Sequence, residues 1–124
     1  LIVKALTKKL KLSTEIIAVS TIREESGLAM SSRNKLLNNQ QLEKVAVLYQ
    51  SLLFCKNSKD VLSFSNMREQ ITTRLSKAEI ELEYLTFADA NSLKIITESN
   101  PKGQTAVCIA AYIDDVRLID NIIF

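Results

Sequence analysis

Charged, hydroxyl and flexible residues gather between residues 23 and 34, in a stretch that has neither helical nor strand periodicity. Gly27 stands in its middle, and Ser31, Ser32 and Arg33 follow near its end. Short hydroxyl side chains and backbone N–H groups can surround phosphate oxygens, and a guanidinium adds planar donors that are always charged. The same residue types also occur in ordinary helix N-caps and solvated turns. Residue chemistry alone therefore leaves both a phosphate site and a plain turn open.

The segments before this loop predict a helix followed by a strand. Residues 1–10 repeat apolar side chains at helical spacing with lysines between them, and residues 14–22 form a run rich in β-branched side chains. Such a run is typical of a strand buried on both faces of a parallel sheet, and ligands bind at the carboxyl ends of such strands. The position of the loop therefore favours the phosphate site. Because the chain starts at Leu1 and a lone strand lacks partners, we expect a piece of a longer protein.

Two amphipathic helices are expected after the loop. The first spans about residues 40–55, and an Asn pair at residues 38–39 offers its N-cap. The start of the second helix stays open, and Asn66 and Glu69 have the spacing of a capping box if its regular part begins late. Five apolar residues are expected on the core-facing side of this second helix: Val61, Phe64, Met67, Ile71 and Leu75.

The last third of the chain changes to strand periodicity. Ile80, Leu82 and Tyr84 alternate with glutamates, which predicts a strand at residues 80–87 with one wet face. Turns are expected at residues 89–93 and 100–103, and two β-rich runs, 105–113 and 116–124, are separated by only two residues, as in a hairpin. The sequence therefore predicts an α+β domain with two main helices and a three-stranded antiparallel sheet, preceded by the helix–strand remnant of another domain.

Charge and composition exclude several classes of function. Sixteen Lys and Arg against fourteen Asp and Glu leave a net charge of +2, too small to indicate nucleic acid or an anionic membrane surface. The chain has no His, and its two cysteines, Cys55 and Cys108, lie far apart, so neither an ordinary zinc site nor an imidazole base is expected. No apolar run reaches membrane-spanning length. We expect a cytoplasmic chain with both thiols buried in a reducing compartment, and a disulfide between them stays open.

Two segments carry a resemblance to a known enzyme family. Residues 21–34, TIREESGLAMSSRN, together with residues 117–121, RLIDN, closely resemble the pantothenate synthetase (pantoate–β-alanine ligase) family, and the similarity runs through the whole chain. The resemblance implies an enzyme that joins pantoate to β-alanine with ATP and Mg²⁺ through a pantoyl-adenylate intermediate, releasing AMP and pyrophosphate. It also implies a Rossmann-type N-terminal domain and a small C-terminal lid domain. Residues 1–22 are then expected to end the first domain, and residues 23–124 to form the lid.

The resemblance assigns roles to the loop residues one by one. Met30, Ser31, Ser32 and Arg33 match the family's counterpart of the KMSKS loop of class I aminoacyl-tRNA synthetases, which binds ATP phosphates. Ser31, Ser32 and Arg33 are the expected catalytic residues, because donors aimed at the departing pyrophosphate stabilise the charge that builds there. Met30 and the backbone of Ile22 are expected to border adenine, which completes the expected ATP-binding set.

The rest of the active site is expected to lie outside this chain. The family's HIGH-type motif, its pantoate-binding glutamines and its nucleotide-binding lysine belong to the N-terminal domain. The resemblance therefore implies that pantoate and β-alanine bind mostly there, and that Mg²⁺ arrives with ATP and takes its protein ligands from there. We expect no metal site in this chain, no turnover by the chain alone, and a homodimer for the full-length enzyme.

A second hypothesis is a non-catalytic nucleotide-binding or protein-interaction module that merely carries a basic, hydroxyl-rich loop. The remaining acidic residues have plain structural interpretations. Asp114 and Asp115 are better explained by a hairpin turn than by a Mg²⁺ site, and Asp120 with Asn121 by structural hydrogen bonding than by catalysis.

Overall fold

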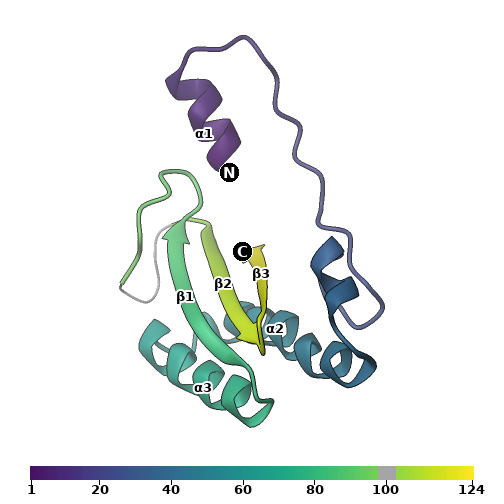
Figure 1. Ribbon diagram of the computed structural model, residues 1–124. Coiled ribbons are helices and arrows are strands. Elements are labelled where there is room, and N and C mark those ends of the chain that lie inside the picture. Colours follow the sequence, from purple (N-terminus) through teal and green to yellow (C-terminus); the bar gives the residue numbers. More distant parts are fainter. Residues whose placement is uncertain (98–102) are drawn as a thin grey trace.

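The computed structural model describes residues 1–97 and 103–124, and it packs two helices against a three-stranded sheet (Figure 1). Helix α1 and the extended segment after it stand apart from this body (Figure 1). The expected α+β fold, with two main helices and an antiparallel sheet, is confirmed. In chain order the elements are α1 (Ile2–Lys9), the 3-10 helix η1 (Ser32–Leu36), α2 (Asn39–Ser58), α3 (Phe64–Lys77), β1 (Glu81–Asp89), β2 (Thr105–Ile113) and β3 (Val116–Ile123).

The sheet is a meander in which β1, β2 and β3 pair as antiparallel neighbours. Asp114 and Asp115 join β2 to β3 as the expected two-residue hairpin, and Asp114 takes the left-handed backbone, with φ of 48°, that such a turn requires. The Nε2 of Gln41 donates to Asp114 Oδ2 at 2.5 Å. This bond fixes the hairpin to the first turn of α2, so the turn interpretation of the Asp pair is confirmed.

Strand β1 contains an irregularity that the alternating sequence did not predict. Leu82 and Tyr84 pair with the neighbouring residues Ala111 and Ala110, so the register with β2 shifts between them. A bulge of this kind moves every later side chain to the opposite face. The expected inward position of Tyr84 is therefore wrong, since its side chain is exposed, and Leu85 and Phe87 are buried in its place.

Helix α2 begins where its sequence predicts. Asn38 is the N-cap, its side chain accepts a bond from Gln41 N at 2.9 Å, and Gln41 Oε1 accepts one from Asn38 N at 2.8 Å. These reciprocal bonds satisfy two backbone donors that the first turn would leave unpaired. The helix continues to Ser58, past the expected end near residue 55, because the polar residues there include no Gly or Pro to stop it.

Helix α3 starts after Val61 and is capped by Ser63. The Ser63 hydroxyl accepts a bond from Asn66 N at 3.1 Å, so the predicted capping box of Asn66 and Glu69 is wrong. Val61 precedes the helix and is exposed, so its assignment to the core is also wrong. The other four predicted core residues are buried on one face of α3: Phe64, Met67, Ile71 and Leu75.

The hydrophobic core lies between the sheet and the faces of α2 and α3 that meet it. Phe64 of α3 stacks on Phe87 of β1 with ring centroids 4.0 Å apart, and Val45, Leu48 and Leu52 fill the α2 side. At the far end of β1 the turn at residues 89–93 forms as expected. Most of the turn expected at residues 100–103 lies outside the described residues.

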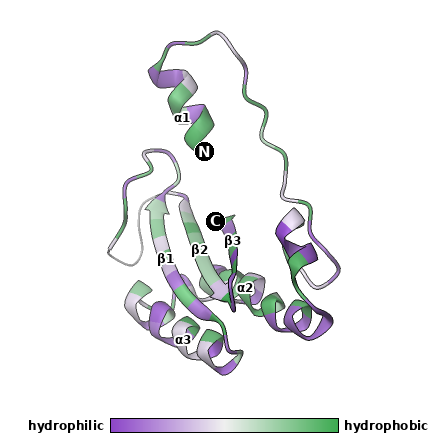
Figure 2. Cartoon of the chain, viewed as in Figure 1, coloured by the Kyte–Doolittle hydropathy of each residue, from purple (hydrophilic) through white to green (hydrophobic). Residues whose placement is uncertain are grey.

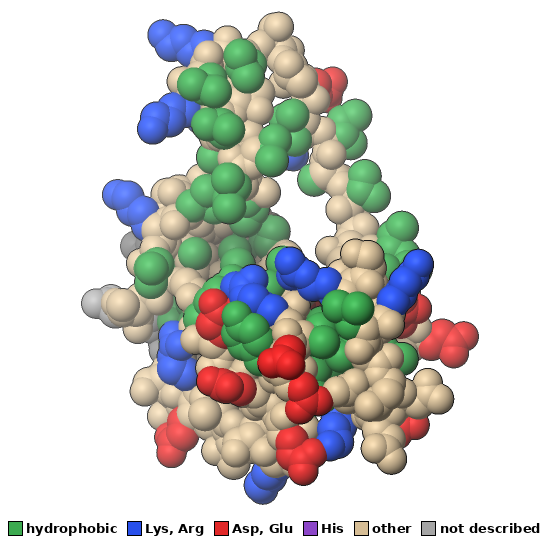
Figure 3. Space-filling view, viewed as in Figure 1, with side chains coloured by type: hydrophobic (Ala, Val, Ile, Leu, Met, Phe, Trp, Pro, Cys, Tyr) green, Lys and Arg blue, Asp and Glu red, His purple; other side chains and the backbone are tan. Residues whose placement is uncertain are grey.

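The strand expected at residues 14–22 is not formed. The segment is extended, yet the described part of the chain offers it no ladder, since the sheet consists of β1, β2 and β3 alone. The side chains of Ile17 and Val19 are 77% and 84% exposed. A strand of this composition buries such side chains only when partner strands and covering layers surround it. The expected helix at the start is confirmed as α1, although none of its residues is buried. Figure 2 shows hydrophobic residues along α1 and this segment, and Figure 3 shows hydrophobic side chains of this region at the surface.

The two cysteines carry free thiols, so no disulfide joins them. Cys55 of α2 lies in the hydrophobic core, as expected, and burial raises the pKa of its thiol to about 12. Cys108 is only half-buried. Within residues 1–97 and 103–124, no helix has the length and apolar character needed to cross a membrane.

Candidate functional site

The loop singled out by the sequence begins as a small hairpin. Glu24 N donates to Leu28 O at 2.9 Å, Gly27 N donates to Glu24 O at 2.8 Å, and Met30 N donates to Ile22 O at 3.0 Å. We call residues 22–30 the loop hairpin. These backbone bonds close a tight turn and leave residues 31–33 directly after its second arm. The phosphate-binding candidates therefore continue from a hydrogen-bonded frame rather than from an open coil.

Gly27 is required at the turn for two physical reasons. Its φ of 87° lies in the left-handed region, where a residue with a Cβ is strained. A Cβ built on it would also lie only 2.4 Å from Cδ1 of Tyr49, a residue of α2. The backbone of the turn thus rests directly on an aromatic ring, and only Gly permits this approach.

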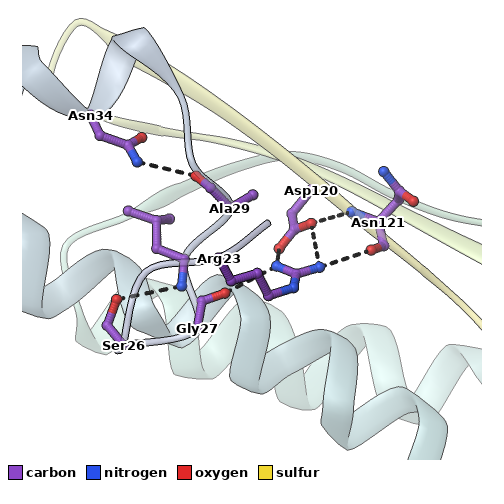
Figure 4. Close-up of polar contacts among 8 residues, drawn as sticks. Arg23, Ser26, Gly27, Ala29, Asn34, Asp120 and Asn121 are labelled. Atoms are coloured by element: carbon purple, nitrogen blue, oxygen red, sulfur yellow. Dashed lines mark hydrogen bonds and ion pairs between the residues drawn. The ribbon is translucent and has the colours of Figure 1, made fainter. Parts of the chain in front are cut away.

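Arg23 fastens the loop hairpin to the last strand (Figure 4). Its guanidinium donates to both carboxylate oxygens of Asp120, at 2.6 and 3.1 Å, and to the Gly27 carbonyl at 3.0 Å. Its Cζ also lies 3.8 Å from the centre of the Tyr49 ring, as in a cation–π contact. The side chain of Asp120 is 2% exposed. The expected hydrogen-bonding role of Asp120 is therefore confirmed, and its partner is an arginine that sequence reasoning left without a role.

The residues after the hairpin form the single turn of η1. Ser31 is its N-cap, and its hydroxyl oxygen accepts a bond from Arg33 N at 3.2 Å. Asn34 is buried beneath the turn, where its Nδ2 donates to Ala29 O at 3.1 Å and its Oδ1 has no protein partner. The helix-cap interpretation of the loop is thus correct locally. It leaves Ser31, Ser32 and Arg33 with exposed side chains, so capping and ligand binding do not exclude each other.

Arg33 differs from Arg23 in how its charge is compensated. Its Nη1 donates to the backbone carbonyl of Arg117 at 3.4 Å, and none of the ion pairs in the described parts of the chain includes it. Its side chain is exposed. A guanidinium held by one long bond to a neutral oxygen keeps donors for an anion.

Two hollows flank the segment that carries the candidates. A larger one of about 860 Å³ is bordered by Met30, Ser31 and Ser32, and a smaller one of about 220 Å³ by Met30, Ser31 and Arg33. Ile22 lies beside Met30 through their backbone bond but lines neither hollow. The structure therefore brings four of the five expected residues to the edges of these hollows. The larger one also contains Lys35, Glu24, Glu43 and an apolar wall of Leu28, Leu37 and Leu42.

The same region offers no ligand set for a metal ion. Among the described residues, no three His, Cys, Asp or Glu side chains come together in a way that could hold one. Glu24 and Glu43 both border the larger hollow, and Mg²⁺ in proteins is usually held by one or two carboxylates together with waters and substrate phosphates. The residues present thus fit a phosphate-bearing ligand, and two carboxylates alone do not establish a Mg²⁺ site.

Comparison with known proteins identifies the family. A family model described as pantoate-beta-alanine ligase matches residues 1–123. The chain belongs to the pantoate-beta-alanine ligase family. The resemblance carried by residues 21–34 and 117–121 is therefore confirmed, and the two segments that carry it are the ones that Arg23 and Asp120 join.

Curated relatives of this ligase family match almost all of the chain. The pantothenate synthetase of Cytophaga hutchinsonii is 41% identical over 125 residues, which cover 98% of this chain and 44% of that protein. The bifunctional pantoate ligase/cytidylate kinase of Trichodesmium erythraeum is 38% identical over 128 residues, which cover 98% of this chain and 24% of the relative. The chain thus spans less than half the length of these relatives.

Solved ligase structures share the fold. The pantothenate synthetase of Thermus thermophilus superposes with a TM-score of 0.82 at 28% identity, covering 97% of this chain and 44% of that one. The ligase of Francisella tularensis, described as complexed with beta-gamma ATP and beta-alanine, gives a TM-score of 0.62 at 30% identity and covers 97% and 37% of the two chains. ATP use by the ligase family is supported by that complex.

Proposed function

We propose that residues 23–124 form the C-terminal lid domain of a pantoate–β-alanine ligase, and that this lid supplies one side of the ATP site. The observation that carries the proposal is Arg33. It is an exposed guanidinium without an acidic partner in the described parts of the chain, next to the exposed hydroxyls of Ser31 and Ser32. Residues 1–22 are proposed as the end of the nucleotide-binding domain. Their support is the apolar surface of α1 and the segment after it, which is of the kind that a neighbouring domain covers.

The proposed reaction has two steps, and this chain acts in the first. A pantoate carboxylate oxygen attacks the α-phosphorus of ATP, the bond to the bridging oxygen breaks, and pyrophosphate leaves with the electron pair. Arg33, Ser31 and Ser32 would donate to the pyrophosphate oxygens, where negative charge increases towards the transition state. In the second step the amine of β-alanine attacks the acyl carbon and AMP leaves. When bound, Mg²⁺ would neutralise phosphate charge, and its ligands are proposed to lie outside the described residues.

A hybrid enzyme tests this proposal. The matching segment of the Cytophaga hutchinsonii relative would be exchanged for this chain, and pantothenate, AMP and pyrophosphate would be measured with pantoate, β-alanine and MgATP. We expect turnover, and Arg33→Ala should slow adenylation by about 100-fold or more, as removal of a donor to a transition-state anion does. Arg68→Ala removes the same side chain from an exposed position on α3 and should change nothing. Unchanged single-turnover formation of pantoyl adenylate by Arg33→Ala would contradict the role of Arg33.

The chain by itself separates the two hypotheses. Alone it should bind ATP weakly through residues 30–33 and form no AMP, because one side of a site cannot position both substrates. Robust turnover by the isolated chain would show that the N-terminal domain is dispensable. A folded hybrid without turnover, combined with ATP binding by the isolated chain, would instead favour the non-catalytic nucleotide-binding module.

A further inference from the structure

Asp120 is a buried carboxylate on the inner face of the sheet. It pairs in register with Ile109 of β2, and both residues are buried on the side that faces the helices. Leu118, two positions earlier, shares that face and belongs to the core. A carboxylate in such apolar surroundings requires a partner that supplies charge and directed donors. Its partner, Arg23, comes from a segment 97 residues earlier in the chain.

Arg23 uses both terminal nitrogens of its guanidinium on these internal contacts. Beyond the two bonds to Asp120 and the bond to Gly27, its Nη2 donates to the Asn121 carbonyl at 3.4 Å, and the planar group lies over Tyr49. These contacts reach β3, α2 and the turn of the loop hairpin itself. Because Asp120 neutralises the charge of Arg23, this arginine is not the one that is free for a phosphate. Arg33 has that freedom.

The loop hairpin connects the Arg23–Asp120 ion pair to the candidate phosphate-binding residues. Met30 N is bonded to Ile22 O, next to Arg23, and Asn34 Nδ2 is bonded to Ala29 O, so both ends of the segment 31–33 are tied to the hairpin. If the hairpin leaves β3, the exposed donors of Ser31 and Ser32 leave with it, and Arg33 keeps one long bond of its own to that strand, from Nη1 to the Arg117 carbonyl at 3.4 Å. Their position thus depends on an ion pair that they do not touch.

We propose that Arg23 is a positioning residue for the candidate ATP site, and that its ion pair with Asp120 holds Ser31, Ser32 and Arg33 in the place where they meet the phosphates of ATP. The proposal rests on the proposed function for its ligand. The contact between the loop hairpin and β3 is independent of that function and can be measured without ATP. Arg23 does not contact the nucleotide in this scheme.

The attachment is tested by amide hydrogen exchange of this chain without ligand. In Asp120→Asn, the amides of Gly27 and Met30 should exchange at least about tenfold faster, and by a larger factor than the β2 amides, since the hairpin then opens locally. Leu75→Ala, which truncates the core side of α3, is the control, and it should accelerate hairpin amides no more than β2 amides. Equal acceleration of hairpin and β2 amides in Asp120→Asn would overturn the proposal. Should Asp120→Asn fail to fold, Arg23→Lys keeps the charge, loses the two-pronged bond and serves the same comparison.

The link to ATP is tested with two variants of opposite charge. Arg23→Met removes a positive charge and Asp120→Asn removes a negative one, and ATP titration of each chain is followed at the amides of Ser32 and Arg33. Both should weaken ATP binding by about tenfold, because the apparent affinity falls with the fraction of chains whose loop is in place. If the two side chains acted on ATP only through their charges, Arg23→Met would weaken ATP binding and Asp120→Asn would strengthen it. That result would refute the positioning role of Arg23. Absence of ATP shifts in the unaltered chain would refute the proposed function, and the exchange result would still decide the attachment.

Discussion

Replacing Gly27 by Ala adds one methyl group at a point where the structure has no room for it. The new Cβ would lie 2.4 Å from Tyr49 Cδ1, and the guanidinium of Arg23 lies over the face of that ring, with its Cζ 3.8 Å from the ring centre. Forcing a methyl group into a packed site costs about 1–3 kcal/mol. The backbone φ of 87° adds about 1–2 kcal/mol for a residue with a Cβ. We therefore expect a loss of about 2–5 kcal/mol in the free energy of unfolding.

Urea unfolding of four chains resolves the two contributions. Gly27→Ala is measured alone and in a Tyr49→Ala background, and the difference between its two costs is the interaction of the methyl group with the ring. With the ring removed, only the backbone cost of about 1–2 kcal/mol should remain. An equal cost in both backgrounds would refute the close approach to Tyr49. A cost near zero in the unaltered background would show that the hairpin does not rest on α2 in solution.

Three further predictions concern the frame around the site. Asn38→Ala should lower the free energy of unfolding by about 1 kcal/mol, measured by urea unfolding, because it removes the cap of α2. Gln41→Ala removes only the reciprocal bond of the capping box, so it should lower the free energy of unfolding by less than the double change Asn38→Ala with Gln41→Ala. Burial raises the Cys55 pKa from 9.0 to about 12, so the folded chain keeps this proton while the unfolded chain loses it, and stability falls as the pH rises from 9 towards 12. The stability advantage over Cys55→Ala should thus shrink by about 1.4 kcal/mol between pH 8 and pH 10, and an unchanged advantage would contradict the burial of the thiol. The protease Glu-C should cut after Glu15 well before it cuts in α2, because residues 12–22 lack regular structure. Mass spectrometry of the fragments over time measures this order, and a first cut in α2 would contradict it.

Local sequence signals predicted the elements whose causes are local. The Asn38 cap, the apolar face of α3 from Phe64 to Leu75 and the Asp114–Asp115 hairpin each depend on neighbours a few residues away, and each formed as expected. Residues 14–22 failed for the opposite reason. Their β-branched run predicts a strand only where other strands and covering helices surround it, and the described part of the chain supplies none.

The sequence named residues for the candidate site but did not show what supports them. Resemblance placed Met30, Ser31, Ser32 and Arg33 in one loop, and the structure places all four at the surface beside the two hollows. No periodicity or turn rule relates Arg23 to a partner 97 residues away, so the ion pair stayed hidden. The bulge before Tyr84 was equally hidden, since it is set by pairing with β2 rather than by the alternation of β1 itself.

The distance in sequence between Arg23 and Asp120 sets an order of events during synthesis. Residues 23–34 emerge from the ribosome long before residues 117–121, and α2, α3 and the first two strands are made in between. The loop hairpin can close on its own backbone bonds at once, but the carboxylate that fastens it does not yet exist. The residues proposed to bind ATP phosphates therefore reach their final position only when β3 has been made, so a chain interrupted before residue 120 would carry the loop without its anchor.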